Sequence, residues 1–257
     1  MLLVSPPRVA VRGWALATQA LSHPSWAVSH LSNFNEAVHD RKHPWQWAPV
    51  ESLSVVDALQ KAGGWQQAEI RAVLDELVAP SGPESSTLTV DQDGSSEFIQ
   101  LANAWCRLAK PQLVLETGVA HGFSTASILQ ALERNGSGHL ISIDLPHLHP
   151  DAIRTIGAAV PKELRSRWTL CLGGEATTIP RAMAARTEPL DLFVQDASHS
   201  YRGQLKAYAA AWPFLRDGGV LLSDDVSEPF DVFARQVGRT PIYVDQPKWR
   251  PVGLLIK

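Results

Sequence analysis

Residues 113–125 read Leu-Val-Leu-Glu-Thr-Gly-Val-Ala-His-Gly-Phe-Ser-Thr. The first four residues are mostly apolar and predict a buried parallel strand that ends on Glu116. Gly118 and Gly122 predict a turn, and Ser124 opens a stretch in which apolar residues recur at helical spacing. A strand, a glycine turn and a helix N-terminus in this order are typical of a nucleotide-binding corner, because a side chain on either glycine would collide with the ligand.

Predicted strands and helices alternate from residue 111 to the end of the chain. Helical stretches separate the first five strands, which predicts right-handed crossovers and a doubly wound parallel sheet. Only residues 246–251 separate the last two strands, so we expect an antiparallel hairpin there. The fold class is therefore α/β, with a mostly parallel, seven-stranded, Rossmann-like sheet. Strands are predicted at residues 113–116, 139–144, 168–172, 191–195, 219–224, 241–245 and 252–257. Helices are predicted at residues 124–134, 150–159 with a continuation to about 167, 176–186, 202–215 and 228–237.

The first 95 residues differ from the rest in composition. Five of the nine tryptophans lie within the first 65 positions, namely Trp14, Trp26, Trp45, Trp47 and Trp65. Helical spacing is present at residues 52–61 and 65–78, residues 80–86 resemble a linker, and the next helix is expected at 97–109. We divide the chain into a helical N-terminal extension, residues 1–95, and a main domain, residues 96–257. The tryptophans are explained by packing, by a lid or wall of an acceptor pocket, or by a dimer contact.

Composition limits the classes of partner. A net charge of −3 offers no electrostatic attraction to nucleic acid or to an anionic membrane. No apolar run approaches the roughly 20 residues of a membrane span. The apolar run at residues 1–4 is too short for a signal peptide. Cys106 and Cys171 are the only cysteines, and we expect both to be free thiols. These features predict a soluble cytoplasmic protein.

Acidic residues follow every strand of the predicted parallel sheet. They are Glu116, Asp144, Glu175, Asp196 and the pair Asp224–Asp225. Ligands of such sheets bind at the carboxyl ends of the strands. Asp144 stands where nucleotide-binding proteins place a carboxylate on the ribose hydroxyls, although a loop or helix-cap aspartate is the alternative. Glu175 is a weaker candidate for the adenine pocket, since the register of Gly-Gly-Glu is ambiguous by one residue.

Three segments resemble class I S-adenosylmethionine-dependent methyltransferases. The turn has the spacing Glu-x-Gly-x-x-x-Gly-x-Ser-Thr, which resembles the first motif of that class. Residues 191–201, Asp-Leu-Phe-Val-Gln-Asp-Ala-Ser-His-Ser-Tyr, and residues 215–226, Leu-Arg-Asp-Gly-Gly-Val-Leu-Leu-Ser-Asp-Asp-Val, are similar to segments of the small-molecule O-methyltransferases. The resemblance covers residues 96–257 and departs from the family pattern at Ala197 and Asp217. It implies S-adenosylmethionine as cofactor, bound by Glu116, Gly118, Gly122, Ser124, Asp144, Glu175 and Asp196.

The resemblance also implies a metal ion. In metal-dependent members, the acids after the fourth and fifth strands hold one Mg²⁺, and here these are Asp196, Asp224 and Asp225. Three carboxylates on neighbouring strand ends would repel one another unless a hard cation neutralised them, which agrees with this assignment. The alternative is that Asp224 and Asp225 only cap the helix that begins near residue 228.

His199 is the candidate general base, three residues after Asp196. An imidazole can accept the proton that an acceptor hydroxyl must lose during methyl transfer, although a lone histidine is more often a surface or packing residue. The predicted activity is Mg²⁺-dependent O-methylation of a small molecule, such as a sugar-bearing or aromatic natural product. The expected partner is that acceptor rather than nucleic acid or membrane. Whether the protein forms a homo-oligomer is left open. The alternatives are a non-catalytic binding protein on the same scaffold and, less favoured, an NAD-dependent oxidoreductase, which would need a tighter glycine motif.

Overall fold

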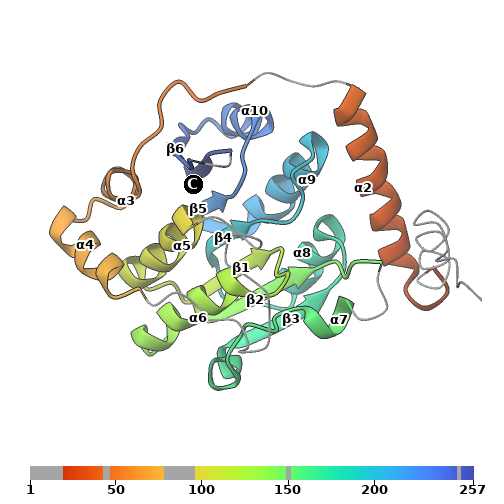
Figure 1. The fold of residues 1–257 in the computed structure, drawn as a ribbon, viewed down its shortest axis with the longest axis horizontal. Helices are drawn as coiled ribbons and strands as arrows, with labels where there is room; N and C mark the ends of the chain where they lie inside the picture. Colours follow the sequence, from red (N-terminus) through yellow and green to blue (C-terminus); the bar gives the residue numbers. More distant parts are fainter. Residues whose placement is uncertain (1–19, 43–46, 78–95, 149–151, 248–249) are drawn as a thin grey trace, which may run out of the picture.

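The computed structural model describes residues 20–42, 47–77, 96–148, 152–247 and 250–257. A seven-stranded sheet with the order β3-β2-β1-β4-β5-β7-β6 forms the centre, with helices on both faces (Figure 1). The strands are β1 (Leu113–Thr117), β2 (His139–Asp144), β3 (Trp168–Leu172), β4 (Leu190–Gln195), β5 (Leu215–Ser223), β6 (Ile242–Val244) and β7 (Val252–Ile256). The first five strands pair in parallel, and β7 lies antiparallel to both β5 and β6. The predicted doubly wound sheet with a terminal hairpin is confirmed.

Alternate residues of the central strands build two hydrophobic cores. Val114 of β1 packs toward helices α5 (Ser96–Ala109) and α6 (Phe123–Asn135), and Leu113 and Leu115 pack on the opposite face. The opposite face is covered by α8 (Glu175–Ala184), α9 (Tyr201–Ala211) and α10 (Glu228–Gln236). Both faces of β1 are therefore buried, which explains why its sequence is a continuous apolar run rather than an alternating one.

The predicted helix over residues 150–167 is wrong in extent. The structure has only the short helix α7 (Ala152–Thr155) and, after a turn, the 3-10 helix η2 (Lys162–Arg167). Gly157 has a left-handed φ of +68°, and Pro161 precedes η2. Each of these residues interrupts helical hydrogen bonding, so the segment forms two short pieces. Likewise, the helix predicted at 202–215 ends at Ala211, followed by the 3-10 turn η3 (Trp212–Phe214).

Two helices of the extension share the core of the main domain. Helices α3 (Val55–Gly63) and α4 (Gln67–Asp75) pack against α5, and they bury Leu59 and Ile70 in the core on that face. Just before α3, the backbone N–H of Leu53 donates to the carbonyl of Tyr243 on the edge strand β6, at 2.8 Å. This contact covers the hydrogen-bonding edge of the sheet. The extension is thus continuous with the main hydrophobic core at this end.

Described tryptophans of the extension fill gaps between elements. Trp65 packs edge-on against Trp105 of α5, with ring centroids 5.0 Å apart. The indole N–H of Trp47 donates to Asp231 of α10 at 2.6 Å. Trp26 is buried in a third helix, α2 (Pro24–Lys42), which is described with the site below. Trp14, Trp45 and the predicted linker at 80–86 lie outside the described residues.

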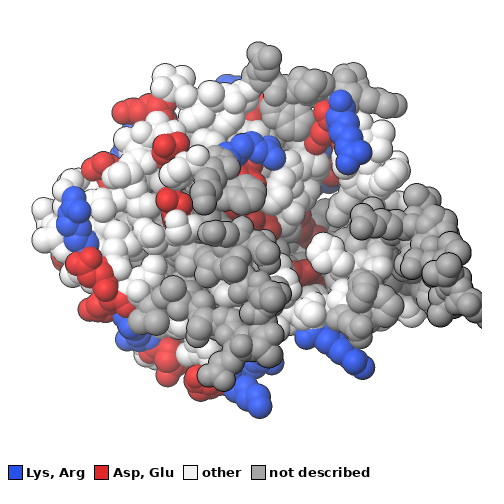
Figure 2. Space-filling model, viewed as in Figure 1, with Lys and Arg blue, Asp and Glu red and all other residues white. Residues whose placement is uncertain are grey.

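Free thiols are confirmed for both cysteines, with Cys106 buried and Cys171 partly buried. Across the described ranges, no helix has the length and apolar character needed to cross a bilayer. On the face drawn in Figure 2, acidic and basic side chains are interspersed over the described surface.

Candidate functional site

A cavity of about 300 Å³ opens at the carboxyl ends of β1, β2, β3 and β4. This is the edge at which ligands of doubly wound sheets bind. Four predicted site residues line it, namely Gly118, Asp144, Glu175 and Asp196. The parallel pairing of the four strands brings these residues together from positions far apart in the chain.

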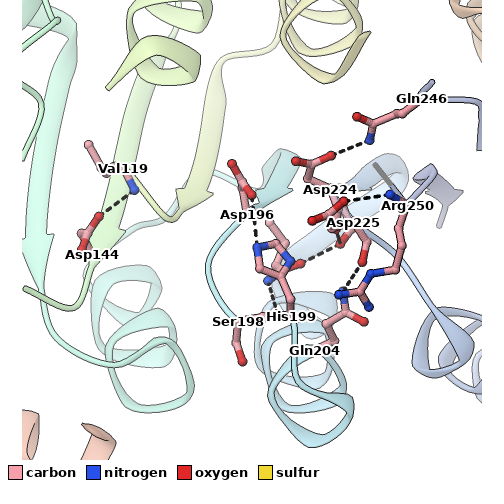
Figure 3. A network of polar contacts seen from close by, with 12 residues as sticks. Val119, Asp144, Asp196, Ser198, His199, Gln204, Asp224, Asp225, Gln246 and Arg250 are labelled. Carbon is pink, nitrogen blue, oxygen red and sulfur yellow. Dashed lines mark hydrogen bonds and ion pairs between the residues drawn. The ribbon is translucent and has the colours of Figure 1, made fainter. Parts of the chain in front are cut away.

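The glycine turn between β1 and α6 closely approaches the end of β4. Gly118 has a φ of +85°, and a Cβ built on it would lie 1.9 Å from the carbonyl oxygen of Asp196. Both the backbone angle and the contact exclude a larger residue. Oδ2 of Asp144 accepts hydrogen bonds from the backbone N–H groups of Val119 (2.7 Å) and Ala120 (2.9 Å) (Figure 3). Asp144 therefore fixes the turn at the cavity wall.

Glu116 lies behind this turn and is not among the residues that line the cavity, so its contact with a cofactor stays a prediction. Its side chain is fully buried and accepts hydrogen bonds from the hydroxyls of Ser124 (2.8 Å), Thr125 (2.7 Å) and Ser142 (2.6 Å). Burial raises the pKa of Glu116, and the three hydroxyl donors oppose this effect. The carboxylate thus joins β1, β2 and the first turn of α6.

Gly122 and Ser124 are likewise placed behind the turn. Gly122 has a φ of +93°, and a Cβ built on it would lie 2.9 Å from the Cα of Gly157. Ser124 is buried with its hydroxyl on Glu116. Of the residues of this motif, Gly118 and Ala120 line the cavity, and cofactor binding by Gly122 and Ser124 stays a prediction.

Glu175 is the first residue of α8, and its carboxyl group is buried at the cavity. Burial raises its pKa to about 7, against the opposing effect of the neighbouring Thr117 and Gln195 side chains. Within the described part of the chain, Oε1 of Glu175 has no hydrogen-bond partner. A buried acceptor without a partner carries an energetic cost, which a donor group of a ligand would remove.

Sequence analysis missed the helix that forms the outer wall of the cavity. Helix α2 supplies the lining residues Ser29, His30, Ser32, Asn33 and Glu36. Apolar residues are spread around α2 without a single stripe, since Val28, Leu31 and Phe34 are exposed. The signal that was present is the absence of glycine and proline from residues 25–42.

A second group of polar residues lies beside Asp196, at the ends of β4 and β5 (Figure 3). Nε2 of His199 lies 3.6 Å from Oδ1 of Asp196. Burial lowers the pKa of His199, and the negative charge of Asp225 opposes this effect. Among the described residues, Nδ1 of His199 is buried and has no hydrogen-bond partner. The imidazole is therefore favoured in its neutral form, which is able to accept a proton.

The acidic pair after β5 is held by the loop between β6 and β7. Asp224 is only 5% exposed, and its Oδ1 accepts a hydrogen bond from Nε2 of Gln246 at 2.7 Å. Burial raises the pKa of Asp224 to about 7, and the amide donor opposes this effect. Asp225 has a left-handed φ of +47°, and its Oδ1 accepts from the backbone N–H of Arg250 at 3.1 Å.

The predicted magnesium ligands are neighbours without forming a complete coordination site. Within the described ranges, no group of three or more histidine, cysteine, aspartate or glutamate side chains is arranged as a metal site. Carboxylate oxygens at Asp196, Asp224 and Asp225 are the donor type that Mg²⁺ prefers. The donor chemistry thus fits the ion, whereas Gln246 and Arg250 occupy one oxygen each of Asp224 and Asp225.

Comparisons with known proteins identify the domain. Residues 115–226 match a family model described as a methyltransferase domain. None of the curated proteins compared with the chain matches it. One similar solved structure is the O-methyltransferase TomG from Streptomyces achromogenes, involved in tomaymycin synthesis and in complex with SAM. It is 17% identical, with a TM-score of 0.51 and coverage of 86% of this chain and 95% of that one.

A second similar structure is the O-methyltransferase from Bacillus cereus in complex with SAH. It is 16% identical, with a TM-score of 0.50 and coverage of 79% of this chain and 97% of that one. At these identities the likeness shows the fold. The family match and the fold together confirm the resemblance predicted from the motifs. Residues 115–226 thus match a methyltransferase domain, and the described part of the chain has the fold of these two O-methyltransferase structures.

The three hydrogen bonds of Glu116 predict a loss of stability when this residue is substituted. Glu116→Leu leaves three buried hydroxyls without their acceptor and is expected to lower the free energy of unfolding by about 3 kcal/mol. Glu116→Gln keeps one acceptor oxygen in the same volume and is expected to lose less. Urea denaturation of both variants measures the difference. Equal stability of the wild type and Glu116→Leu would show that this carboxylate does not hold the turn.

Proposed function

We propose that this protein transfers the methyl group of SAM to a hydroxyl group of a small molecule. The observation that carries the proposal is the arrangement of residues at the cavity. The glycine turn, held by Asp144, meets Asp196 there, and His199 lies beside Asp196. The cavity lies on one side of Asp196 and the histidine and acidic pair on the other. Cofactor and acceptor would therefore meet at the end of β4.

The cofactor half of the site is assigned to Gly118, Asp144 and Glu175. Gly118 lets the turn pass directly against the end of β4, because a Cβ at this position would meet the Asp196 carbonyl. Oδ2 of Asp144 is taken by two backbone amides, so its other oxygen is the acceptor available for ribose hydroxyls. Glu175 offers the buried Oε1 atom to a donor of the ligand. SAM supplies an electrophilic methyl group on a positively charged sulfur.

The acceptor half of the site is assigned to His199. As the hydroxyl oxygen forms its bond to the methyl carbon, the carbon–sulfur bond breaks and sulfur keeps the electron pair. The hydroxyl proton must leave in the same process, and we assign neutral His199 as the group that accepts it. The chemistry leaves an ether, S-adenosylhomocysteine and a protonated imidazole. A small natural product with a sugar or aromatic hydroxyl is the proposed acceptor class.

Magnesium is a separate part of the proposal. Asp196, Asp224 and Asp225 would hold the ion after a change in the contacts of Gln246 and Arg250. Support comes from the three acids at neighbouring strand ends, whose mutual repulsion a divalent cation would relieve. The ion would acidify a hydroxyl bound to it.

Substitution of Asp144 tests the proposed cofactor site. Asp144→Ala removes the acceptor of two turn amides and is expected to weaken S-adenosylhomocysteine binding by about 1–3 kcal/mol. Isothermal calorimetry measures this change, with Asp217→Ala, an exposed acid on β5, as the matched control. If the wild type bound NAD(H) and not S-adenosylhomocysteine, the proposed function would be overturned.

Substitution of His199 tests its proposed role as the base in methyl transfer. His199→Ala is expected to lower kcat about 10²–10⁴-fold, because a positioned base contributes this much, while S-adenosylhomocysteine affinity stays unchanged. Transfer of a labelled methyl group from SAM to a panel of catechols and glycosylated aromatic compounds gives the rate. Tyr201→Phe is the comparison variant, since Tyr201 carries a phenol hydroxyl two residues after His199, at the start of α9. A kcat within a few-fold of the wild type for His199→Ala would remove it from the mechanism.

Metal dependence is tested by chelation and by direct binding. EDTA is expected to abolish methyl transfer, and Mg²⁺ or Mn²⁺ to restore it. Mn²⁺ binding, followed by electron paramagnetic resonance, is expected in the wild type and in Asp217→Asn but not in Asp224→Asn. Full turnover of metal-free protein would instead assign the three acids to direct hydrogen bonding of the acceptor.

A further inference from the structure

Helix α2 is in contact with the loops that follow three different strands. After β2, the carbonyl of Pro146 lies 2.9 Å from Nε2 of His30. After β4, Oδ2 of Asp40 accepts the backbone N–H of Tyr201, at the start of α9, at 3.0 Å. Figure 1 shows α2 standing alongside α8 and α9 at this end of the sheet. The helix therefore spans the loops that together form the cavity.

The loop after β3 is shaped for this helix at Gly174. Gly174 has an ordinary φ of −71°, so its backbone conformation does not require glycine. A Cβ built on it would lie 2.3 Å from the hydroxyl oxygen of Ser29 and 2.9 Å from its Cβ. The close approach of α2 is thus the physical reason for a glycine at this position.

Glu36 makes the two shortest of the described hydrogen bonds between α2 and the main domain. It is 6% exposed, and its two carboxylate oxygens accept from Nζ of Lys206 (2.5 Å) and from the hydroxyl of Ser200 (2.7 Å). Ser32, one turn earlier on α2, donates to Glu36 at 3.1 Å. Burial would raise the pKa of Glu36, but the Lys206 and Ser200 contacts outweigh it and lower the pKa. The charged carboxylate is therefore the form that binds α9.

The Ser200 hydroxyl has two functions in this contact. It donates to Glu36 and accepts the backbone N–H of Gly203, which makes it the N-cap of α9. It also lies 3.1 Å from the hydroxyl of Ser198 on the cavity wall. Glu36 thus connects α2 to the same loop that carries Asp196 and His199.

We propose that α2 is a movable wall of the cofactor site and that Glu36 is the positioning residue that holds it closed. The identity of the ligand rests on the proposed function, whereas the closure rests on the contacts of α2. A ligand in the cavity is covered by Ser29, Asn33 and Glu36 on one side and by the strand ends on the other. Release of the product S-adenosylhomocysteine then requires the Glu36 contacts to open, so these contacts set the release rate.

Release kinetics of S-adenosylhomocysteine test the inference. Glu36→Gln keeps the size of the side chain and removes the charge that binds Lys206. The expected result is release about 10-fold faster than in the wild type, since a hydrogen bond to a charged group contributes about this factor. Stopped-flow displacement with excess SAM gives the rate. Asn35→Ala, on the exposed side of the same helix, is the matched control and is expected to release at the wild-type rate.

A second pair of variants tests the same helix at its contact with Gly174, in the loop after β3. Gly174→Ala is expected to displace α2 at Ser29 and to accelerate release. Adding Ser29→Ala removes the nearer of the two clashing atoms and is expected to restore part of the wild-type rate. A direct effect of the new methyl group on the ligand would not be restored in this way.

Thermal unfolding separates closure from stability. Faster release from folded Glu36→Gln, with a Tm close to that of Asn35→Ala, supports the inference. If folded Glu36→Gln releases S-adenosylhomocysteine at the wild-type rate, the inference is overturned. If Glu36→Gln does not fold, the release rate of Lys206→Met is compared with that of the wild type instead. Failure of the wild type to bind S-adenosylhomocysteine contradicts the proposed function instead, so the two failures are distinguishable.

Discussion

One oxygen of Asp144 accepts two backbone amides of the glycine turn, and the cavity depends on this contact. Three of the five residues from Gly118 to Gly122 have left-handed φ angles, and one of them is Ala120, at +46°. A non-glycine residue in this region is strained and persists only where its surroundings determine it. Asp144 holds the turn from the cavity side, and Glu116 holds the helix start behind it. The turn is thus fixed between two carboxylates before any ligand binds.

Buried carboxylates recur through the molecule with different partners. Glu116 is satisfied by hydroxyls alone, Glu36 by a lysine and hydroxyls, and Asp224 by one amide. Hydroxyl and amide donors offset less of the desolvation cost than a cation does, so burial raises the pKa of Glu116 and Asp224 while that of Glu36 is lowered. Glu36, the carboxylate of these three that has a lysine partner, is the one with a lowered pKa. This charged pair joins α2 to α9.

The sequence predicted the parts of the molecule that depend on local pattern. The strand, turn and helix at 113–125 and the alternation of parallel strands with helices follow from apolar periodicity and glycine spacing, and both are confirmed. The hydrogen bonds of Glu116 with three hydroxyls were not predicted, because a motif gives the spacing of residues and not the side of the turn that each side chain faces. Helix α2 was missed because its buried residues are polar as well as apolar, as Trp26 and Glu36 illustrate. Its position depends on long-range contacts such as Glu36 with Lys206, which no window of sequence contains.

The two ends of the N-terminal extension relate to the main domain in different ways. Helices α3 and α4 bury Leu59 and Ile70 in the same core as α5, so this part is held by apolar burial. Helix α2 is instead held by directional polar contacts to Pro146, Ser200 and Lys206, with Trp26 as a buried apolar anchor. Apolar burial is lost only when packed elements separate widely, whereas a small set of hydrogen bonds can exchange with water one at a time. A helix that must open and reclose over a ligand needs the second kind of attachment, and α2 has it at the cavity.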